Sequence, residues 1–307
     1  MSQNSKIEWT DHTFNPWEGC QKISPGCDHC YAETRNARFA GGTAVNWGLG
    51  APRRRTSASN WRKPIAWNAA QAEFFAAHGR RQRVFCASLA DVFDNAVDPA
   101  WRQDLLELIE KTPNLDWLLL TKRVGNVPNM VPPGWLKMHP NVWMGASTVN
   151  QEEADRDIPK LLALPARVRF LSMEPLLGPV NISRYMWPVH WSWDGKYKTP
   201  QDALAAGAYA EQKRQSLVGA HCQFLDWVIV GGESGTQARA MHPAWARALR
   251  DQCTAAGVPF LFKQWGEWAP IGERRSILGC TLHDMERIGK KAAGRDLDGI
   301  QHDGYPK

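Results

Sequence analysis

The sequence lacks any apolar run long enough to cross a bilayer, and it lacks an N-terminal secretion signal. Of its 307 residues, 43% are hydrophobic and 22% are charged, a composition typical of globular proteins and not of disordered ones. The first nine residues are polar, with no apolar stretch after their one Lys. We therefore expect a cytoplasmic chain outside the membrane, folded as one large domain or two ordinary ones.

Cysteine is sparse, and its count of seven is odd, which argues against a disulfide framework in a reducing compartment. Internal repeats and low-complexity tracts are absent as well. Tyrosine is scarce, with 5 residues against 16 Trp, and we expect some of these Trp rings to be exposed for stacking on a flat ligand. The net charge of +6 permits a polyanionic partner.

Short apolar runs recur along the chain and are typical of strands buried on both faces. They lie at 84–87, 117–120, 142–145, 168–171, 227–230 and 259–262, with a further strand near 10–15. Helical patterns separate them, at 31–40, after Asp98 and Pro99, after Asn150, and from Pro243 to Gly257. This alternation predicts an α/β fold, a partial parallel (β/α) barrel of about six to seven strands; a doubly wound open sheet is the alternative.

We expect one barrel domain over residues 1–266, followed by a C-terminal extension over 267–307 that covers one end of the barrel. Two intervals between strands are too long for a simple connection and predict helical insertions at about 41–70 and 181–226, the second with a helix near 201–215. Pro159 is expected to kink or split the helix that follows Asn150.

Polar side chains follow the predicted strands directly. They are Ser88 and Asp91, Thr121 to Arg123, Ser147 and Thr148, Ser172 and Glu174, Gly231 to Ser234, and Lys263 and Gln264. Barrels gather their chemistry at the C-terminal ends of the strands, so the whole set predicts a common polar site. Each residue alone is equally typical of a turn or a helix cap.

Three cysteines, Cys20, Cys27 and Cys30, lie within eleven residues, between the first predicted strand and the helix after it. A structural zinc ion needs four closed ligands, and His29 or His12 can supply a fourth. Three cysteines without an obvious fourth also suit a four-iron, four-sulfur (4Fe-4S) cluster that keeps one iron open. The cluster is the favoured interpretation, and zinc and unligated thiols are the alternatives.

This loop, placed after the first strand of a parallel partial barrel, resembles the radical S-adenosylmethionine (SAM) superfamily of TIM-barrel-like enzymes. The resemblance implies that Cys20, Cys27 and Cys30 bind a 4Fe-4S cluster whose open iron binds SAM through its amino and carboxylate groups. It implies reductive cleavage of SAM to a 5′-deoxyadenosyl radical that takes hydrogen from a substrate. An electron donor such as flavodoxin or ferredoxin is implied as well.

Further motifs are spread over nearly the whole chain. They are Trp9-Thr10-Asp11, Asn15-Pro16, Gly19-Cys20 and Gly294-Arg295, with the segments 26–32, 171–177, 231–235 and 262–266. With these motifs the chain resembles an uncharacterised phage and prophage protein family that carries three cysteines.

Carried over residue by residue, the superfamily resemblance puts His29 near the adenine of SAM and Gly231, Gly232 and Glu233 at its amino group. The chain departs from the common pattern in two respects. The first cysteine gap, of six residues, is longer than usual, and Gly-Gly-Glu follows about the sixth strand instead of the second. Glu233 is therefore also a candidate for the SAM ribose or the substrate.

Other strand-end residues are candidates for the remaining contacts. Ser88 or Asp91 can take the amino-group role, and Ser147 and Glu174 are candidates for the ribose hydroxyls. Lys122, Arg123 and Lys263 are candidates for the SAM carboxylate or a substrate phosphate, with ion pairs to Glu174 or Glu233 as the alternative. Lys122, Glu174 and Lys263 are also the candidate catalytic residues.

Basic residues interleave with Trp between positions 47 and 83. They are Arg53 to Arg55, Arg62, Lys63, Arg80, Arg81 and Arg83, among Trp47, Trp61 and Trp67. This pattern suits a nucleic acid or nucleotide substrate, and a solvated basic surface is the alternative. A phage context would fit modification or repair of an extruded base. Two other functions compete: a non-catalytic, zinc-stabilised nucleic-acid-binding protein, and a metal-free hydrolase with Glu174 and Glu233 as acid and base.

Overall fold

The computed structural model describes residues 5–186, 224–270 and 285–306, which fall into two compact units. The first unit comprises Met1–Ser147 with Leu164–Val168, and the second comprises Thr148–Ala163 with Arg169–Lys307. The predicted helix near 201–215 and most of the predicted insertion 181–226 lie outside the described residues. The prediction of one barrel domain with a C-terminal extension stays a prediction.

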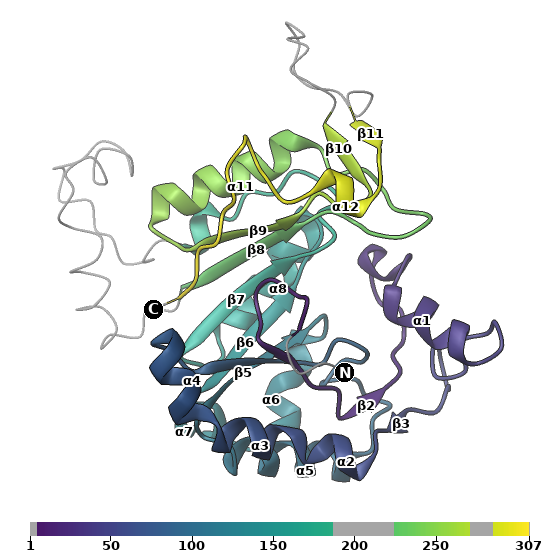
Figure 1. The fold of residues 1–307 in the computed structure, drawn as a ribbon, viewed down its shortest axis with the longest axis vertical. Helices are drawn as coiled ribbons and strands as arrows, with labels where there is room; N and C mark the ends of the chain where they lie inside the picture. The colour runs from purple at the N-terminus through teal and green to yellow at the C-terminus, as the bar shows by residue number, and fades with distance from the viewer. Residues whose placement is uncertain (1–4, 187–223, 271–284, 307) are drawn as a thin grey trace, which may run out of the picture. The chain divides into compact units, whose positions relative to one another are not determined.

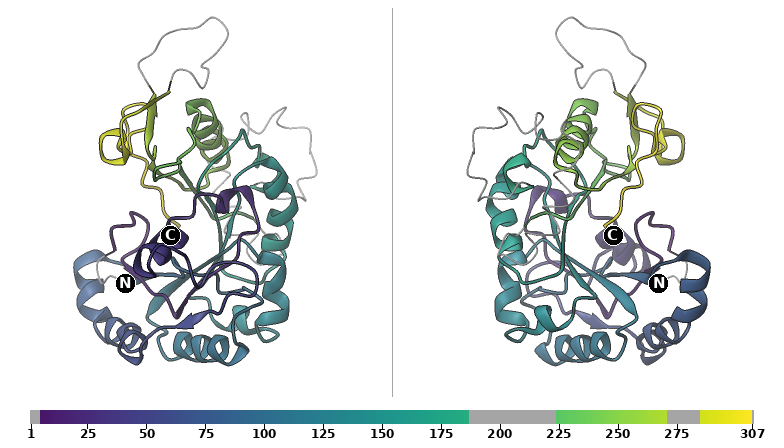
Figure 2. Two further views of the ribbon diagram at one scale, coloured as in Figure 1. Left: turned by 90° about the vertical axis from the view of Figure 1, so that its right-hand side faces the viewer. Right: turned by 90° about the vertical axis from the view of Figure 1, so that its left-hand side faces the viewer.

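The first unit is built on parallel strands in the order β1 (His12–Thr13), β4 (Gln82–Cys86), β5 (Leu115–Thr121) and β6 (Val142–Ser147). Every residue of β4 and β6 is buried, which explains why their sequences show little polar alternation. The helices of this unit are α1 (Tyr31–Phe39), α2 (Ala58–Trp61), α3 (Lys63–Ala69), α4 (Gln71–His78), α5 (Pro99–Glu110), α6 (Val127–Met130) and α7 (Trp135–Met138). The helices α2, α3 and α5 lie in a row along one side of the strands, and α1 lies apart from that row (Figure 1; Figure 2 gives two further views).

The second unit contains the parallel strands β7 (Val168–Met173), β8 (Trp227–Gly231) and β9 (Phe260–Gln264), in that order. The helix α11 (Pro243–Ala256) packs against β8 and β9. A small antiparallel hairpin of β10 (Trp268–Pro270) and β11 (Met285–Arg287) leads to α12 (Lys290–Ala293). With these seven parallel strands and their helices, the predicted α/β class and partial parallel (β/α) barrel are confirmed.

The helix boundaries follow the capping residues that the sequence indicates. The Asp98 side chain accepts a hydrogen bond from Ala100 N at 2.9 Å at the start of α5, and Asn150 Oδ1 accepts one from Glu153 N at 2.9 Å at the start of α8 (Gln151–Leu162). The helix α8 runs unbroken through Pro159. Of the predicted kink or split, the split is therefore wrong, because a Pro in a late turn removes only one backbone donor; the kink stays a prediction.

Within the part of the chain that the structure describes, no helix has the length and apolar character that a membrane span requires.

Candidate functional site

The cysteine loop begins at Gly19, a position that only glycine can occupy. Just before it, β2 (Trp17–Glu18) pairs antiparallel with β3 (Arg54–Arg55). Gly19 then adopts φ 116°, and a Cβ there would lie 2.6 Å from Asn46 O. The Gly19 N–H donates to Leu89 O at 3.0 Å, and the Gly48 N–H donates to Cys20 O at 3.0 Å. Cys20 is therefore fixed beside the segment that follows β4.

The other two thiols lie at the entrance to α1. Cys27 is buried and ends a short 3-10 turn over Pro25–Cys27, and Cys30 is the residue that caps α1. Burial raises the pKa of the Cys30 thiol, while the backbone N–H groups of Ala32 and Glu33 lower it. These amides at a helix N-terminus are suited to a thiolate.

The loop is tied to α1, and α1 to the residues after β4. Lys22 Nζ donates to Asp28 O at 3.2 Å within the loop and forms an ion pair with Glu33 of α1 at 3.2 Å. Tyr31 Oη donates to Ser88 O at 2.6 Å. The Tyr31 bond holds the start of α1 against the residues after β4.

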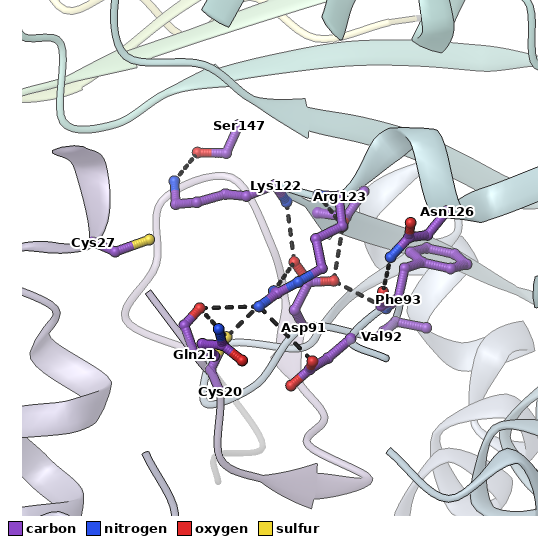
Figure 3. Close-up of polar contacts among 12 residues, drawn as sticks. Cys20, Gln21, Cys27, Asp91, Val92, Phe93, Lys122, Arg123, Asn126 and Ser147 are labelled. Carbon is purple, nitrogen blue, oxygen red and sulfur yellow. Dashed lines mark hydrogen bonds and ion pairs between the residues drawn. The ribbon is translucent and has the colours of Figure 1, made fainter. Parts of the chain in front are cut away.

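Arg123, which follows β5, contacts the Cys20 thiol directly. Its Nη1 lies 3.5 Å from Cys20 Sγ, and its Nη2 donates to Gln21 O at 2.9 Å (Figure 3). Burial raises the pKa of Cys20 to about 11 and Asp91 adds to the rise, while Arg123 opposes both. The thiol is thus half-buried and faces a cation.

All three thiols are free. Cys27 is close enough to Cys30 to affect its titration, and Cys27 Sγ lies 3.8 Å from Ser24 Oγ. Among the described residues, no three His, Cys, Asp or Glu side chains are arranged to hold a single metal ion. The three thiols thus lie on one loop but do not meet at one point, and their role as cluster ligands stays a prediction. His29, which lies between them in sequence, is half-buried, and its predicted role also stays a prediction.

Asp91 uses both carboxylate oxygens to brace the ends of β4 and β5. Its Oδ1 accepts from Phe93 N at 2.9 Å and Thr121 Oγ1 at 2.7 Å, and its Oδ2 accepts from Lys122 N at 3.1 Å and Arg123 Nη1 at 3.2 Å. These bonds give Asp91 a role in positioning Arg123. A contact to the SAM amino group stays a prediction.

The remaining candidates of the first unit also lie at strand ends. Ser88 Oγ accepts from Asn15 Nδ2 at 3.0 Å. Lys122 Nζ donates to the buried Ser147 Oγ, which joins the ends of the neighbouring strands β5 and β6. The predicted gathering of these residues at the C-terminal ends of the strands is thus observed for Asp91, Lys122, Arg123 and Ser147 (Figure 3).

In the second unit, Glu174 and Lys263 pair across the end of β8. Lys263 Nζ lies 2.5 Å from Glu174 Oε2, and Ser172 Oγ donates to Glu174 Oε1 at 3.3 Å. A Cβ on Gly231 would lie 3.1 Å from the same Glu174 Oε2. The ends of β7, β8 and β9 therefore meet around this ion pair, as the strand-end pattern predicts.

The Gly232-Glu233 turn has a structural explanation in this unit. A Cβ on Gly232 would lie 1.9 Å from Trp265 O, so only glycine fits. Glu233 is buried and binds Arg239 through both oxygens, Oε1 to Nη2 at 2.7 Å and Oε2 to Nε at 2.9 Å. Glu233 is thus held by Arg239 and Glu174 by Lys263, and the metal-free hydrolase with these two carboxylates as acid and base stays an alternative.

The predicted basic region is largely neutralised by ion pairs. Arg54 pairs with Glu18, Arg55 with Asp104, Arg80 with Asp11 and Arg81 with Asp116. Arg53 is a correction to the prediction: its side chain is 1% exposed, and its Nε lies 2.7 Å from Asp94 Oδ2. A nucleic acid cannot reach this guanidinium.

The Trp residues of this region differ in the same way. Trp67 is buried and stacks on His12 with ring centroids 4.2 Å apart. Trp61 is half-buried and lies under the Arg55 guanidinium at 4.4 Å. Of these two rings, only Trp61 is placed where a ligand can contact it.

Two partners in the site were not apparent from the sequence. Asp94 holds Arg53 and lies 3.8 Å from Arg123 Nη2, and Arg239 holds Glu233. The sequence shows that Asp94 and Arg239 are charged and lie a few residues after a strand. It does not show which residue each of them pairs with.

A family model for a protein of unknown function, DUF5131, matches residues 4–306. The chain belongs to the DUF5131 family. No curated protein matches it. The phage affiliation stays a prediction.

Among solved structures, the DUF5131 chain is similar to spore photoproduct lyase in complex with a dinucleoside spore photoproduct. The identity is 10%, the match covers 77% of this chain and 59% of that chain, and the TM-score is 0.36. A mutant spore photoproduct lyase matches with 13% identity, 81% and 62% coverage and a TM-score of 0.39. The chain spans less than two thirds of the length of these solved proteins.

Proposed function

We propose that this DUF5131 protein is a radical SAM-type enzyme in which Cys20, Cys27 and Cys30 hold a 4Fe-4S cluster. The observation that carries the proposal is the loop itself, with its three free thiols and the Arg123 guanidinium against Cys20. When bound, the cluster and SAM supply one-electron reduction and hydrogen abstraction from a substrate.

The donor set fits this group. Thiolates are soft ligands that select iron–sulfur clusters or zinc. In a cluster, each cysteine binds a different iron, so three thiols on one loop need not meet at one point. Burial raises the pKa of both the Cys20 and the Cys30 thiol, and specific groups oppose this rise: Arg123 at Cys20 and the backbone N–H groups of Glu33 and Ala32 at Cys30. These groups favour the thiolate that iron binding requires.

The residues around the loop have proposed roles in binding SAM. Lys122 is close enough to Cys30 to lower the pKa of its thiol, so its ammonium is suited to the SAM carboxylate. Ser147, which holds the Lys122 Nζ, and Ser88 remain candidates for hydroxyl and amino groups, and His29 for the adenine.

In the second unit, the pair of Glu174 and Lys263 is the candidate for proton transfer or for binding a substrate phosphate. Gly231, Gly232 and Glu233 remain candidates for contacts to SAM. These assignments rest on strand-end placement.

We further propose a nucleotide or nucleic acid as the substrate and a small redox protein of the flavodoxin or ferredoxin kind as the electron donor. The net charge of +6 and the Arg55–Trp61 stack support a polyanion with flat rings. A cytoplasmic location suits such chemistry.

The test is anaerobic reconstitution with iron and sulfide, followed by absorption and EPR spectra with and without SAM. Wild type is compared with Cys27→Ala and with Cys253→Ala, which removes a buried thiol of α11 as a matched control. We expect four irons per chain and a reduced-cluster signal that changes with SAM in wild type and Cys253→Ala, and neither in Cys27→Ala. A colourless protein with one zinc per chain would refute the proposal and favour a zinc-stabilised binding protein.

A further inference from the structure

Arg123 makes more contacts than charge neutralisation requires. Its side chain is 9% exposed and lies near two carboxylates, Asp91 at 3.2 Å and Asp94 at 3.8 Å. A buried cation needs such partners. The same guanidinium also donates to Gln21 O at 2.9 Å and lies 3.5 Å from Cys20 Sγ (Figure 3). One group thus joins the end of β5 to the cysteine loop, 103 residues away in sequence.

The backbone around Arg123 is fixed as firmly as its side chain. The Arg123 N–H donates to Thr121 Oγ1 at 2.8 Å, and Thr121 Oγ1 donates to Asp91 at 2.7 Å. The next backbone donor, Lys122 N, binds the other Asp91 oxygen at 3.1 Å. Asp91 therefore sets the direction in which the guanidinium leaves the strand.

We propose that Arg123 is a positioning residue for the cluster. It holds the Cys20 end of the loop in place, and its N–H donor and charge raise the reduction potential of the bound cluster. The proposal rests on the proposed function, because it needs a cluster on Cys20. Hydrogen bonds to cysteine sulfur and nearby positive charge favour the more negative, reduced state of a cluster.

Arg102 offers a matched control. It lies on α5 and is buried, and it supports the same segment by donating to Val92 O at 3.0 Å and Asp94 O at 2.9 Å. None of its recorded hydrogen bonds reaches the cysteine loop. An effect that arises only from loosening residues 91–94 should therefore appear in Arg102→Met as well.

The experiment is an EPR-monitored redox titration of the reconstituted full chain, in wild type, Arg123→Met, Arg123→Lys and Arg102→Met. We expect Arg123→Met to make reduction about tenfold less favourable, which is 59 mV for a one-electron couple. Arg123→Lys, which keeps the charge without the planar fork, should recover part of the shift. Arg102→Met should keep the wild-type potential.

A second readout uses iron-free protein. Amide hydrogen exchange over residues 20–30 should accelerate in Arg123→Met and stay at the wild-type rate in Arg102→Met. A wild-type potential and wild-type exchange in Arg123→Met would overturn the inference, and so would an equal potential shift in Arg102→Met. If wild type takes up no iron, the proposed function fails, and the effect of Arg123 on the cluster potential fails with it. If wild type binds four irons but Arg123→Met keeps the wild-type reduction potential, only the effect of Arg123 on the potential is refuted.

Discussion

Replacing Arg53 with Ala should lower the free energy of unfolding of the protein. It should not weaken a nucleic-acid-binding surface. The Arg53 and Asp94 side chains are 1% and 3% exposed, and their Nε and Oδ2 atoms are 2.7 Å apart. Removing one partner of a buried ion pair costs about 3–5 kcal/mol, because the other charge stays buried. Arg123 Nη2, 3.8 Å from Asp94 Oδ1, offsets part of that cost.

Arg53 also supports the loop that carries Asn46. Its Nη1 donates to Asn46 O at 3.2 Å and Ala51 O at 2.8 Å. Each lost hydrogen bond contributes about 1 kcal/mol. We therefore expect Arg53→Ala to lower the free energy of unfolding by about 4 kcal/mol, a large fraction of the usual 5–15 kcal/mol.

Arg54→Ala is the matched control, since it changes the same residue type at the next position. The Arg54 side chain is 65% exposed, and its partner Glu18 keeps Arg35 at 3.3 Å. Glu18 is itself buried, at 7% exposed. Because it keeps Arg35 as a partner and the Arg54 guanidinium is exposed, we expect Arg54→Ala to cost about 1 kcal/mol.

The assay is urea unfolding of wild type and both variants, with retention on a nucleic-acid column measured over a range of salt concentrations. A partial recovery of stability in Arg53→Met with Asp94→Leu would show that the buried charge is the cause. The reasoning is refuted if Arg53→Ala is as stable as wild type, or if Arg54→Ala costs as much.

Two further predictions concern Asp116 and Gly19. Burial raises the pKa of Asp116 to about 6 in spite of Arg81, so the folded state holds a proton that the unfolded state releases near pH 4, and stability falls as pH rises from about 4 to 6. Asp116→Asn should stabilise the fold by about 2–3 kcal/mol at pH 7 and by nothing at pH 3.5, measured by urea unfolding; an equal gain at both pH values would contradict this. Gly19→Ala should lose iron binding on reconstitution, because its Cβ would lie 2.6 Å from Asn46 O. The control Gly79→Ala, at a left-handed position with no atom within 4 Å of the added Cβ, should cost only about 1 kcal/mol of stability and bind iron normally. Normal iron binding in Gly19→Ala would contradict the role given to the loop geometry.

The strands were predictable because their signal is local. A run such as 142–145 is apolar at every position, and the whole of β6 is buried. The helix starts at Asp98 and Asn150 were predictable for the same reason, since a cap and the amide it binds are two or three residues apart.

The pairing of charges was not predictable because it is not local. Arg53 and Asp94 are 41 residues apart, and nothing in the triplet Arg53 to Arg55 tells which guanidinium is buried. Strand alternation does not identify it either, because Arg53 lies directly before β3 and both residues of β3, Arg54 and Arg55, are exposed. The buried partner Asp94 decides which guanidinium is buried.

The surroundings of the cysteines give the strongest argument that the loop binds a cofactor. Burial alone raises the pKa of Cys86 and of Cys253, as expected for thiols that only fill space. Cys20 is half-buried and faces a guanidinium that is itself held by Asp91. Asp91 and Asp94 already offset the charge of Arg123, so its N–H toward Cys20 Sγ is not needed to stabilise the guanidinium. That N–H binds a thiolate more strongly than a neutral thiol, and metal binding requires the thiolate.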